Sequence, residues 1–185
     1  MADVVFGDYN PSGKLTATWP VNVGQIPIYY GMRRTGRPAP TTEFEKFKSN
    51  YLDAPNAPLL PFGYGLSYTE FEYSNVKVNS KTLSEGGSIT ISATVRNTGK
   101  YDGEEVVQLY IHDKVRTLTP PMKELKGFKK IFLEKGRSQI VSFNITTEDL
   151  KFYNNEEEFI FEPGEFEFFI GGSSDLEVTG SFTVK

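Results

Sequence analysis

The single histidine, His112, is the first candidate for chemistry, because imidazole is the general base beside the nucleophile of a Ser-His-Asp triad. The sequence contains no cysteine, which excludes disulfides, thiol catalysis and thiolate metal sites. Val107, Leu109 and Ile111 alternate with other residues, so His112 falls on the opposite face of that segment. No Gly-x-Ser-x-Gly elbow is present to hold a nucleophilic serine. We therefore interpret His112 as a surface residue and not as a catalytic base.

Carboxylates are the second candidates, because a pair about 5–5.5 Å apart is the arrangement of a retaining glycosidase. The densest groups fall at the edges or on the outer faces of predicted strands, where charge is normally solvated and discourages pairing between edges. No pair is singled out, and no cluster has the spacing of metal ligands. We assign no catalytic, cofactor-binding or metal-binding residue. The carboxylates considered are Glu156, Glu157, Glu158, Glu165 and Glu167.

Two glycines, Gly63 and Gly65, lie one residue apart in the stretch Pro61–Thr69. A glycine-rich phosphate cradle needs a strand before it and a helix after it, and the sequence shows neither here. Glycine also allows a turn or a close approach to another backbone. We interpret both glycines as serving a tight passage between two regions, and we expect Gly65→Val to damage folding or domain docking before any chemistry.

Four aromatic residues in the first third of the chain could stack on the rings of a sugar: Trp19, Tyr29, Tyr30 and Tyr51. The alternative is that they are buried against a partner surface. We favour the second interpretation, because a stripe of apolar side chains usually marks an interface.

The composition excludes several kinds of partner. The chain has 185 residues, with 20 Lys and Arg against 24 Asp and Glu, and an acidic balance argues against a nucleic-acid surface. No apolar run approaches the roughly 18 residues of a transmembrane helix, so we expect no membrane partner. The sequence after Met1 lacks the basic region and cleavage-site pattern of a signal peptide. We expect either a cytoplasmic protein or a piece of a longer one.

From Thr69 onwards, short alternating segments are separated by turn residues. This pattern predicts an all-β fold, an antiparallel β-sandwich of seven or eight strands of the immunoglobulin or fibronectin type III kind. A change of phase between Tyr73 and Val76 predicts a bulge, and 147–150 predicts a helical turn capped by Thr147. The predicted strands are 71–78, 88–96, 105–112, 126–133, 137–145, 157–161, 165–170 and 181–184.

Residues 1–60 do not resemble a domain. Eight of the eleven prolines lie at or before Pro61, and proline opposes long helices and central strands. Residues 2–6 could end a helix or form a strand, 15–19 could form a strand, and 41–50 could form a helical turn or an extended arm. So long an irregular region is uncommon inside a compact domain. We expect an extended arm that packs on something else.

The order of short motifs along the whole chain resembles the C-terminal part of glycoside hydrolase family 3, in particular the periplasmic bacterial β-glucosidases. The motifs before residue 70 are Phe6–Leu15, Thr18–Pro20, Val23–Pro27, Thr35–Pro38 and Pro61–Thr69. Those after it are Asn97–Gly99, Leu125–Phe128, Leu133–Gly136 and Pro163–Gly164.

This resemblance implies a division of labour. In the family, a (β/α)₈ barrel carries the aspartate nucleophile, an α/β sandwich domain often carries the acid/base glutamate, and a fibronectin type III-like domain follows. Residues 1–68 would be the tail of the α/β domain with a linker arm, and residues 69–185 the fibronectin-like domain. The barrel motif has no counterpart here, so no family catalytic residue can be placed.

Three functions remain open from the sequence. The first is a non-catalytic docking module of a retaining β-glucosidase that hydrolyses terminal β-glucosides, with residues 15–64 as the docking arm. The second is a carbohydrate-binding β-sandwich that holds glucan near the catalytic domains. The third, an autonomous hydrolase, is disfavoured. The expected partners are the catalytic domains of the same polypeptide, an oligosaccharide, or another copy contacted through residues 1–64. The resemblance implies a periplasmic or secreted parent enzyme without a cofactor.

Overall fold

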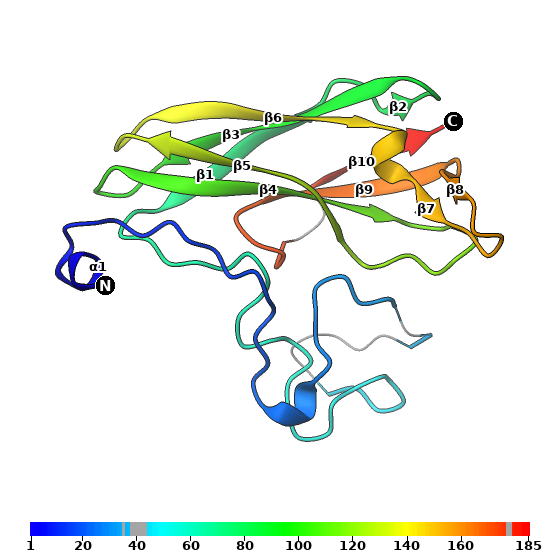
Figure 1. Cartoon of the computed structure of the whole chain (residues 1–185), viewed down its shortest axis with the longest axis horizontal. Helices are drawn as coiled ribbons and strands as arrows, with labels where there is room; N and C mark the ends of the chain where they lie inside the picture. Colours follow the sequence, from blue (N-terminus) through cyan, green and yellow to red (C-terminus); the bar gives the residue numbers. More distant parts are fainter. Residues whose placement is uncertain (35, 38–43, 177–178) are drawn as a thin grey trace.

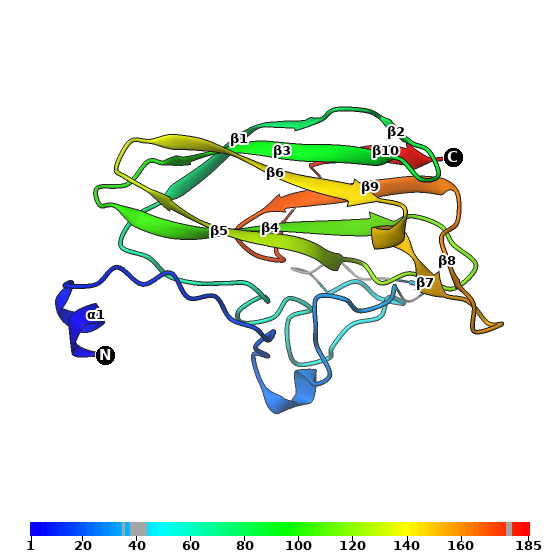
Figure 2. The ribbon, with the colours of Figure 1, turned by 45° about the horizontal axis from the view of Figure 1, so that its top comes forward.

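The computed structural model describes residues 1–34, 36–37, 44–176 and 179–185. Two β-sheets face each other across an apolar core. The described residues of 1–69, which we call the arm, extend from one side of them (Figure 1). The predicted all-β sandwich preceded by an irregular arm is confirmed. Figure 2 shows that the arm lies beneath the sheet that contains β4 and β5.

One sheet has the strand order β1-β3-β6 and the other has the order β2-β10-β9-β4-β5. All neighbours are antiparallel except β2 and β10, which are parallel. A separate hairpin is formed by β7 and β8. The strands are β1 (Phe71–Val78), β2 (Thr82–Leu83), β3 (Ser88–Asn97), β4 (Gly103–Asp113), β5 (Glu124–Leu133), β6 (Ser138–Thr146), β7 (Phe152–Tyr153), β8 (Phe159–Ile160), β9 (Gly164–Gly171) and β10 (Gly180–Val184).

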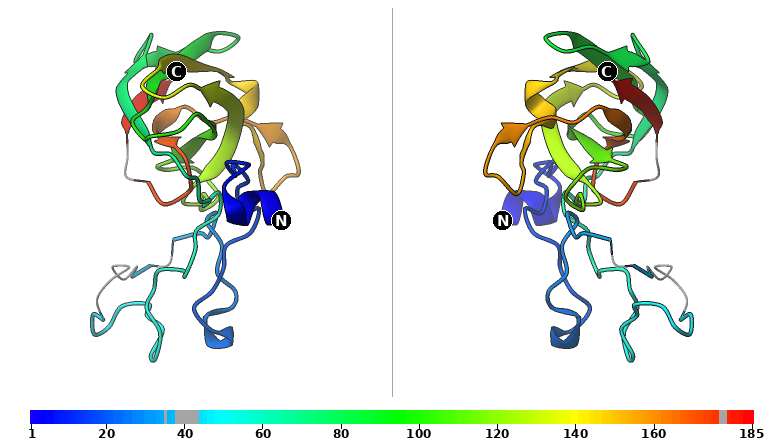
Figure 3. Two further views of the ribbon diagram at one scale, coloured as in Figure 1. Left: turned by 90° about the vertical axis from the view of Figure 1, so that its left-hand side faces the viewer. Right: turned by 90° about the vertical axis from the view of Figure 1, so that its right-hand side faces the viewer.

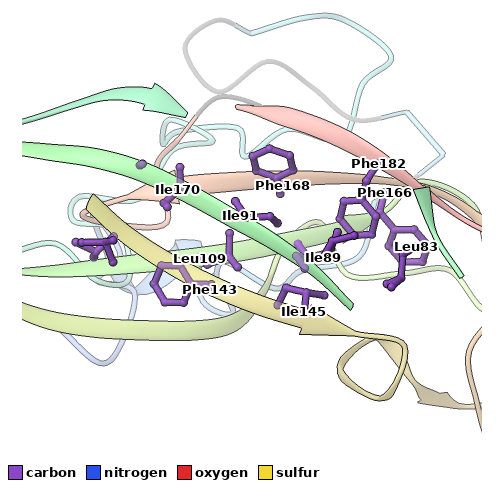
Figure 4. Packing of buried hydrophobic residues seen from close by; sticks show 14 of the residues in the cluster. Leu83, Ile89, Ile91, Leu109, Phe143, Ile145, Phe166, Phe168, Ile170 and Phe182 are labelled. Atoms are coloured by element: carbon purple, nitrogen blue, oxygen red, sulfur yellow. The ribbon is translucent and has the colours of Figure 1, made fainter. Parts of the chain in front are cut away.

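The core forms where the inward-facing residues of both sheets meet, and Figure 4 shows them interdigitating. Fully burying one large apolar side chain stabilises the folded state by about 1.5–3 kcal/mol. The rings of Phe166 and Phe182 stack with their centroids 5.4 Å apart. The inward positions predicted from alternation are buried: Ile89, Ile91, Ala93, Val95, Val107, Leu109, Ile111, Val141, Phe143, Ile145, Phe166, Phe168 and Ile170.

The predicted bulge in β1 is present. The pairing of β1 with β3 shifts register between Ser74 and Lys77, and Asn75 between them has a φ of 50°. Asparagine tolerates this left-handed conformation better than most residues. The bulge turns both Tyr73 and Val76 toward the core, although they are three positions apart and strict alternation would place them on opposite faces.

The strand predicted at 157–161 is wrong at its beginning. Only Phe159–Ile160 is extended, as β8. Asn154 accepts hydrogen bonds from the backbone N–H groups of Glu156 (3.0 Å) and Glu158 (2.8 Å), and Glu157 has a φ of 63°. The three glutamates therefore form the turn between β7 and β8, because the asparagine side chain replaces the strand ladder.

The helical turn predicted at 147–150 exists as a 3-10 helix, η2 (Glu148–Leu150), and Thr147 stands at its N-cap position as predicted. The Thr147 side chain makes no capping hydrogen bond. The Asp149 carboxylate instead accepts from the backbone N–H of Thr146 (2.8 Å) and from its hydroxyl (2.7 Å). The side chain inside the turn therefore satisfies donors that precede it.

Of the three N-terminal segments considered in the sequence, one forms a regular element. Residues 2–6 form a helix, α1 (Ala2–Phe6), which ends at Gly7 with a φ of 85°. Residues 15–19 do not form a strand and share only one bridge, between Trp19 and Leu60. Of the segment 41–50, residues 41–43 lie outside the described residues, and the rest contains a turn and no helix.

Figure 3 shows two limbs of the arm, residues 10–27 and 50–69, extending from the sandwich, and main-chain hydrogen bonds join them into an irregular ribbon. The backbone N–H of Leu15 donates to the carbonyl of Tyr64 (2.8 Å), and that of Trp19 donates to the carbonyl of Leu60 (2.9 Å). The arm is therefore extended but not unpaired, since main-chain bonds between the limbs replace a regular sheet.

A buried glutamine closes the far part of this ribbon. Gln25 lies in the 3-10 helix η1 (Val23–Gln25) and is fully buried. Its amide oxygen accepts from the N–H of Val21 (2.7 Å), and its amide nitrogen donates to the carbonyls of Pro55 (2.7 Å) and Ala57 (2.8 Å). All three hydrogen bonds go to backbone groups in loops, so this one buried side chain holds the far part of the ribbon together.

Candidate functional site

The contact between the arm and the sandwich, which we call the seam, centres on a buried carboxylate. The seam comprises residues 10–15 and 61–69 together with the side of the sheet that they cover. Glu105 on β4 is only 6% exposed. It lies 3.1 Å from the ammonium of Lys14 and accepts a hydrogen bond of 3.0 Å from the hydroxyl of Tyr73. Burial and the Glu105 charge together raise the pKa of Tyr73, so this phenol stays a donor.

A second carboxylate, Glu104, joins the arm at the outer edge of the seam. It accepts from the hydroxyl of Ser12 (3.0 Å) and pairs with Lys130 at 2.6 Å. The hydrogen bonds from Lys130 and Ser12 hold the pKa of Glu104 below its ordinary value. A hollow of about 220 Å³ lies between the two carboxylates, Lys14 and Gly65.

The end of β3 is tied to the arm through a fully buried asparagine, Asn97. Its carbonyl oxygen accepts from the hydroxyl of Thr69 (2.6 Å), and its amide donates to the carbonyls of Tyr101 (2.8 Å) and Leu133 (3.0 Å). Nearby, the Asn10 amide donates to the carbonyl of Asp102 (2.8 Å). Each such bond has a net value of about 1 kcal/mol, but leaving one buried group unpaired costs more.

Glycines allow the close approaches at the seam. A Cβ on Gly65 would lie 2.5 Å from the carbonyl oxygen of Gly13, and a Cβ on Gly63 would lie 2.2 Å from the amide oxygen of Gln108. Gly63 also has a φ of 79°, which favours glycine. The tight passage inferred for both glycines therefore has a geometric basis: each one touches a neighbour that leaves no room for a side chain.

The arm also covers the middle of β4. Gln108 donates through its amide to the carbonyls of Gly172 (2.7 Å) and Gly63 (3.3 Å), and accepts from the hydroxyl of Tyr110. The ring of Tyr30 packs edge-on against Tyr110, with centroids 5.5 Å apart. Burial raises the pKa of Tyr110. Polar residues on the outer face of this strand are buried because the arm lies over them.

A third contact joins the arm to the loop between β4 and β5. The N–H of Met122 donates to the carbonyl of Met32 (2.9 Å). Beside them, Lys123 donates to the carbonyls of Ser174 (2.7 Å) and Leu176 (2.6 Å) and lies over the ring of Phe169. Burial lowers the pKa of Lys123. This lysine links two loops of the sandwich at the point where the arm touches them.

His112, the candidate base, is half-buried in the third contact. Its ring nitrogen Nδ1 lies 2.9 Å from the carbonyl oxygen of Pro121, and its neighbour across the strands is Glu167. It is less exposed than expected, because the loop between β4 and β5 folds back over it. His112 therefore contacts the backbone of that loop.

The other candidate carboxylates lie apart from the seam. Glu165 and Glu167 on β9 both face Lys114, at 3.2 and 3.9 Å. Glu156–Glu158 are exposed in the turn between β7 and β8. Among the described residues, no three His, Asp or Glu side chains gather closely enough to hold a metal ion. In the same part of the chain, no helix has the length and apolar character needed to cross a membrane.

The four aromatic candidates divide into two kinds. Tyr30 packs on Phe62 at 4.6 Å between ring centroids, and the hydroxyl of Tyr51 donates to the carbonyl of Gln25 at 2.7 Å. These two are structural. Trp19 and Tyr29 are 52% and 54% exposed, so they are available to a partner.

Sequence reasoning missed the residues at the centre of the seam, although a signal was present. Glu105 has the same phase as Val107, Leu109 and Ile111, so alternation places its charge on the inward side of β4. An inward charge must be paired, which calls for a cation from elsewhere in the chain. No pattern in the sequence identifies that cation as Lys14, which lies 91 residues away.

One buried acid is outside the seam. Asp113 ends β4 and is 8% exposed; its carboxylate accepts from the N–H of Val115 (3.2 Å). Arg116, Glu124 and Glu162 face it. Burial outweighs the attraction of Arg116 and raises the pKa of Asp113 to about 6.

Two family models match the chain. The "Glycosyl hydrolase family 3 C-terminal domain" matches residues 1–68, and the "Fibronectin type III-like domain" matches residues 105–174. The arm and the sandwich are thus matched by different domain families, and the seam joins them.

Relatives and solved structures match nearly the whole chain. A "Periplasmic beta-glucosidase" of Salmonella typhimurium is 49% identical over 98% of this chain and 24% of the relative. A "Putative beta-xylosidase" of Formosa agariphila is 43% identical over all of this chain and 23% of the relative. The crystal structure of a β-glucosidase from Listeria innocua in complex with glucose superposes with a TM-score of 0.90 at 43% identity, covering 99% of this chain and 25% of that one. The chain spans about a quarter of the length of these proteins.

The close passage at Gly65 predicts a strong effect of the smallest substitution. Gly65→Ala should lower the free energy of unfolding by about 1–3 kcal/mol, because the new methyl group clashes with the backbone of Gly13. Gly13→Ala is the matched control, since a Cβ there meets nothing within 4 Å. Trp19 is the only tryptophan and lies in the arm, so urea unfolding followed by its fluorescence reports this effect. Equal stabilities of the two variants would contradict a tight passage.

The buried Asp113 predicts a dependence of stability on pH. Its pKa is higher in the folded chain than in the unfolded chain, so its ionisation opposes folding and stability decreases as pH rises from about 4 through 6. Asp113→Asn should be more stable than the parent by about 1–3 kcal/mol at pH 7.5 and equally stable near pH 4. Circular dichroism during urea unfolding measures both. A constant difference across this pH range would show that the charge is not responsible.

Proposed function

The chain belongs to the C-terminal region of glycosyl hydrolase family 3, and we propose that it is the non-catalytic docking module of a retaining β-glucosidase. In this proposal, residues 1–68 belong to the tail of an α/β domain and to a linker arm, and residues 69–185 form a fibronectin-like domain. The module supports the part of the polypeptide that cleaves terminal β-glucosides.

The observation that carries this proposal is the contrast between the two sides of the arm. The side on the sandwich is closed by satisfied polar contacts, such as that between Lys14 and Glu105. Away from these contacts the arm exposes a set of nine large apolar residues, and exposed apolar side chains that gather on a surface mark an interaction site. These residues are Trp19, Val21, Val23, Ile26, Tyr29, Phe44, Phe47, Leu52 and Leu59.

The chemistry is assigned to residues outside this chain. The resemblance implies a nucleophile in a barrel domain, and this is supported by relatives that are about four times as long as this chain. The carboxylates in the seam already serve as partners of Lys14, Lys130, Ser12 and Tyr73. We further propose a periplasmic or secreted location, supported by the name of the relative from Salmonella typhimurium.

The isolated chain is expected not to hydrolyse aryl β-glucosides. An assay of chromophore release should give the rate of the buffer blank, while the longer polypeptide encoded by its gene should show turnover. Turnover by the isolated chain that disappears in Glu105→Gln, with the fold preserved by circular dichroism, would instead make this chain a hydrolase.

A carbohydrate-binding module is the second candidate, and the exposure of Trp19 and Tyr29 is the observation that favours it. Exposed aromatic rings such as these can stack on sugar rings. The docking proposal expects no binding of soluble glucans at millimolar sugar, because these rings then serve a protein partner. Titration followed by Trp19 fluorescence decides, and a saturable change lost in Tyr29→Ala would favour carbohydrate.

A further inference from the structure

The outer face of β5 carries two exposed phenylalanines that neither the core nor the arm uses. Phe128 is 68% exposed and Phe132 is 57% exposed. They flank Lys130 on one side of the strand, while Ile131 and Leu133 point into the core. Across four residues of strand, the two rings are about 13 Å apart along β5. Two large apolar groups on one strand face form an anchor pattern typical of interfaces.

This face is the uncovered part of a surface that the arm already occupies. Phe128 is the cross-strand neighbour of Gln108, and Phe132 is the neighbour of Glu104. Both β4 residues contact the arm, through Gly63 and Ser12 respectively. The arm therefore covers the sheet over β4 and leaves the adjacent side chains of β5 open.

The arm also contributes to the edge of this open face. Tyr9 of the arm lies near Lys130 and is itself 53% exposed. Lys130 is paired with Glu104, so the charges among the three rings are already neutralised. The resulting surface, which we call the β5 face (Tyr9, Phe128, Lys130 and Phe132), is aromatic at its ends and neutral at its centre.

The continuity of this surface with the seam identifies its occupant. The arm is matched by one domain family and the sandwich by another, so the seam is a contact between domains, and the β5 face extends it. We propose that the β5 face is a second docking surface, covered by the remainder of the domain to which the arm belongs. This inference rests on the proposed docking function and adds Phe128 and Phe132 as its anchors.

Two other occupants fit the chemistry less well. Phenylalanine has no hydroxyl with which to orient a sugar, and Lys130 and Glu104 already bind each other. A second copy of the chain that bound this face would also contact the arm that lies next to it. The test distinguishes these occupants from the one proposed.

Hydroxyl-radical footprinting of the longer polypeptide and of the isolated chain tests the proposal. The rate of oxidation of Phe128 and Phe132 should be at least about fivefold lower in the longer polypeptide, because side chains at the centre of an interface lose water. Trp19 reports the docking of the arm in the same sample. Tyr153, which is 66% exposed and lies on the distant β7, is the internal control and should react equally in both samples.

The outcomes separate this inference from the proposed function. Equal oxidation of Trp19 in both samples would overturn the docking function and this inference with it. Protection of Trp19 without protection of the two phenylalanines would overturn only the β5 face. Protection of both phenylalanines in the isolated chain at high concentration would assign the face to a second copy, and protection by added glucan would assign it to carbohydrate.

A variant then tests whether the two phenylalanines are anchors. Phe128→Ser/Phe132→Ser should lower the unfolding temperature of the longer polypeptide by about 2–3 °C, and should leave that of the isolated chain nearly unchanged, because both rings are mostly exposed there. Ile140→Ser, which removes a 68% exposed side chain from β6 on the other sheet, should change neither. An equal loss in both proteins would mean that the rings stabilise the sandwich itself.

Discussion

The buried carboxylate of Glu105 is the constraint on which the rest of this structure depends. A charge that is removed from water must be paired, and removing one partner costs several kcal/mol because the other is left uncompensated. Its partners are Lys14 from the arm and Tyr73 from β1. Among the described residues, the cation paired with this charge comes from the arm. The sandwich therefore depends on its contact with the arm.

This dependence explains why the two sides of the arm differ. The inner side is fixed by directional bonds, such as those of Asn97 and Gln108, and by passages that admit only glycine. Directional contacts fix one register and tolerate no sliding. Away from the sandwich the arm exposes many apolar groups, which suit a contact made through shape and desolvation. Such a module presents a rigid surface to its partner, because the contacts between the arm and the sandwich fix the geometry of that surface.

Alternation predicted most of the sandwich, because a buried strand of eight or more residues repeats its pattern enough times to be recognised. The strand at 88–96 is the clearest case. The strands β2, β7 and β8 have two residues each, which is too short for any period. Alternation also distinguishes the two faces of a strand, but it does not predict which other segment covers each face. His112 was placed opposite the core correctly, but a loop half-buries it. Gln108 lies on the same face of β4, and the arm buries it.

The last strand of the sandwich, β10 (Gly180–Val184), lies inside its sheet, between β2 and β9. Until it is in place, β2 has no neighbour in that sheet and β9 has only β4. A growing polypeptide delivers β10 after the strands on either side of it in the sheet, so the sheet that carries Glu105 is completed only once β10 has been synthesised. Whatever precedes the arm on the same polypeptide leaves the ribosome before its supporting surface exists.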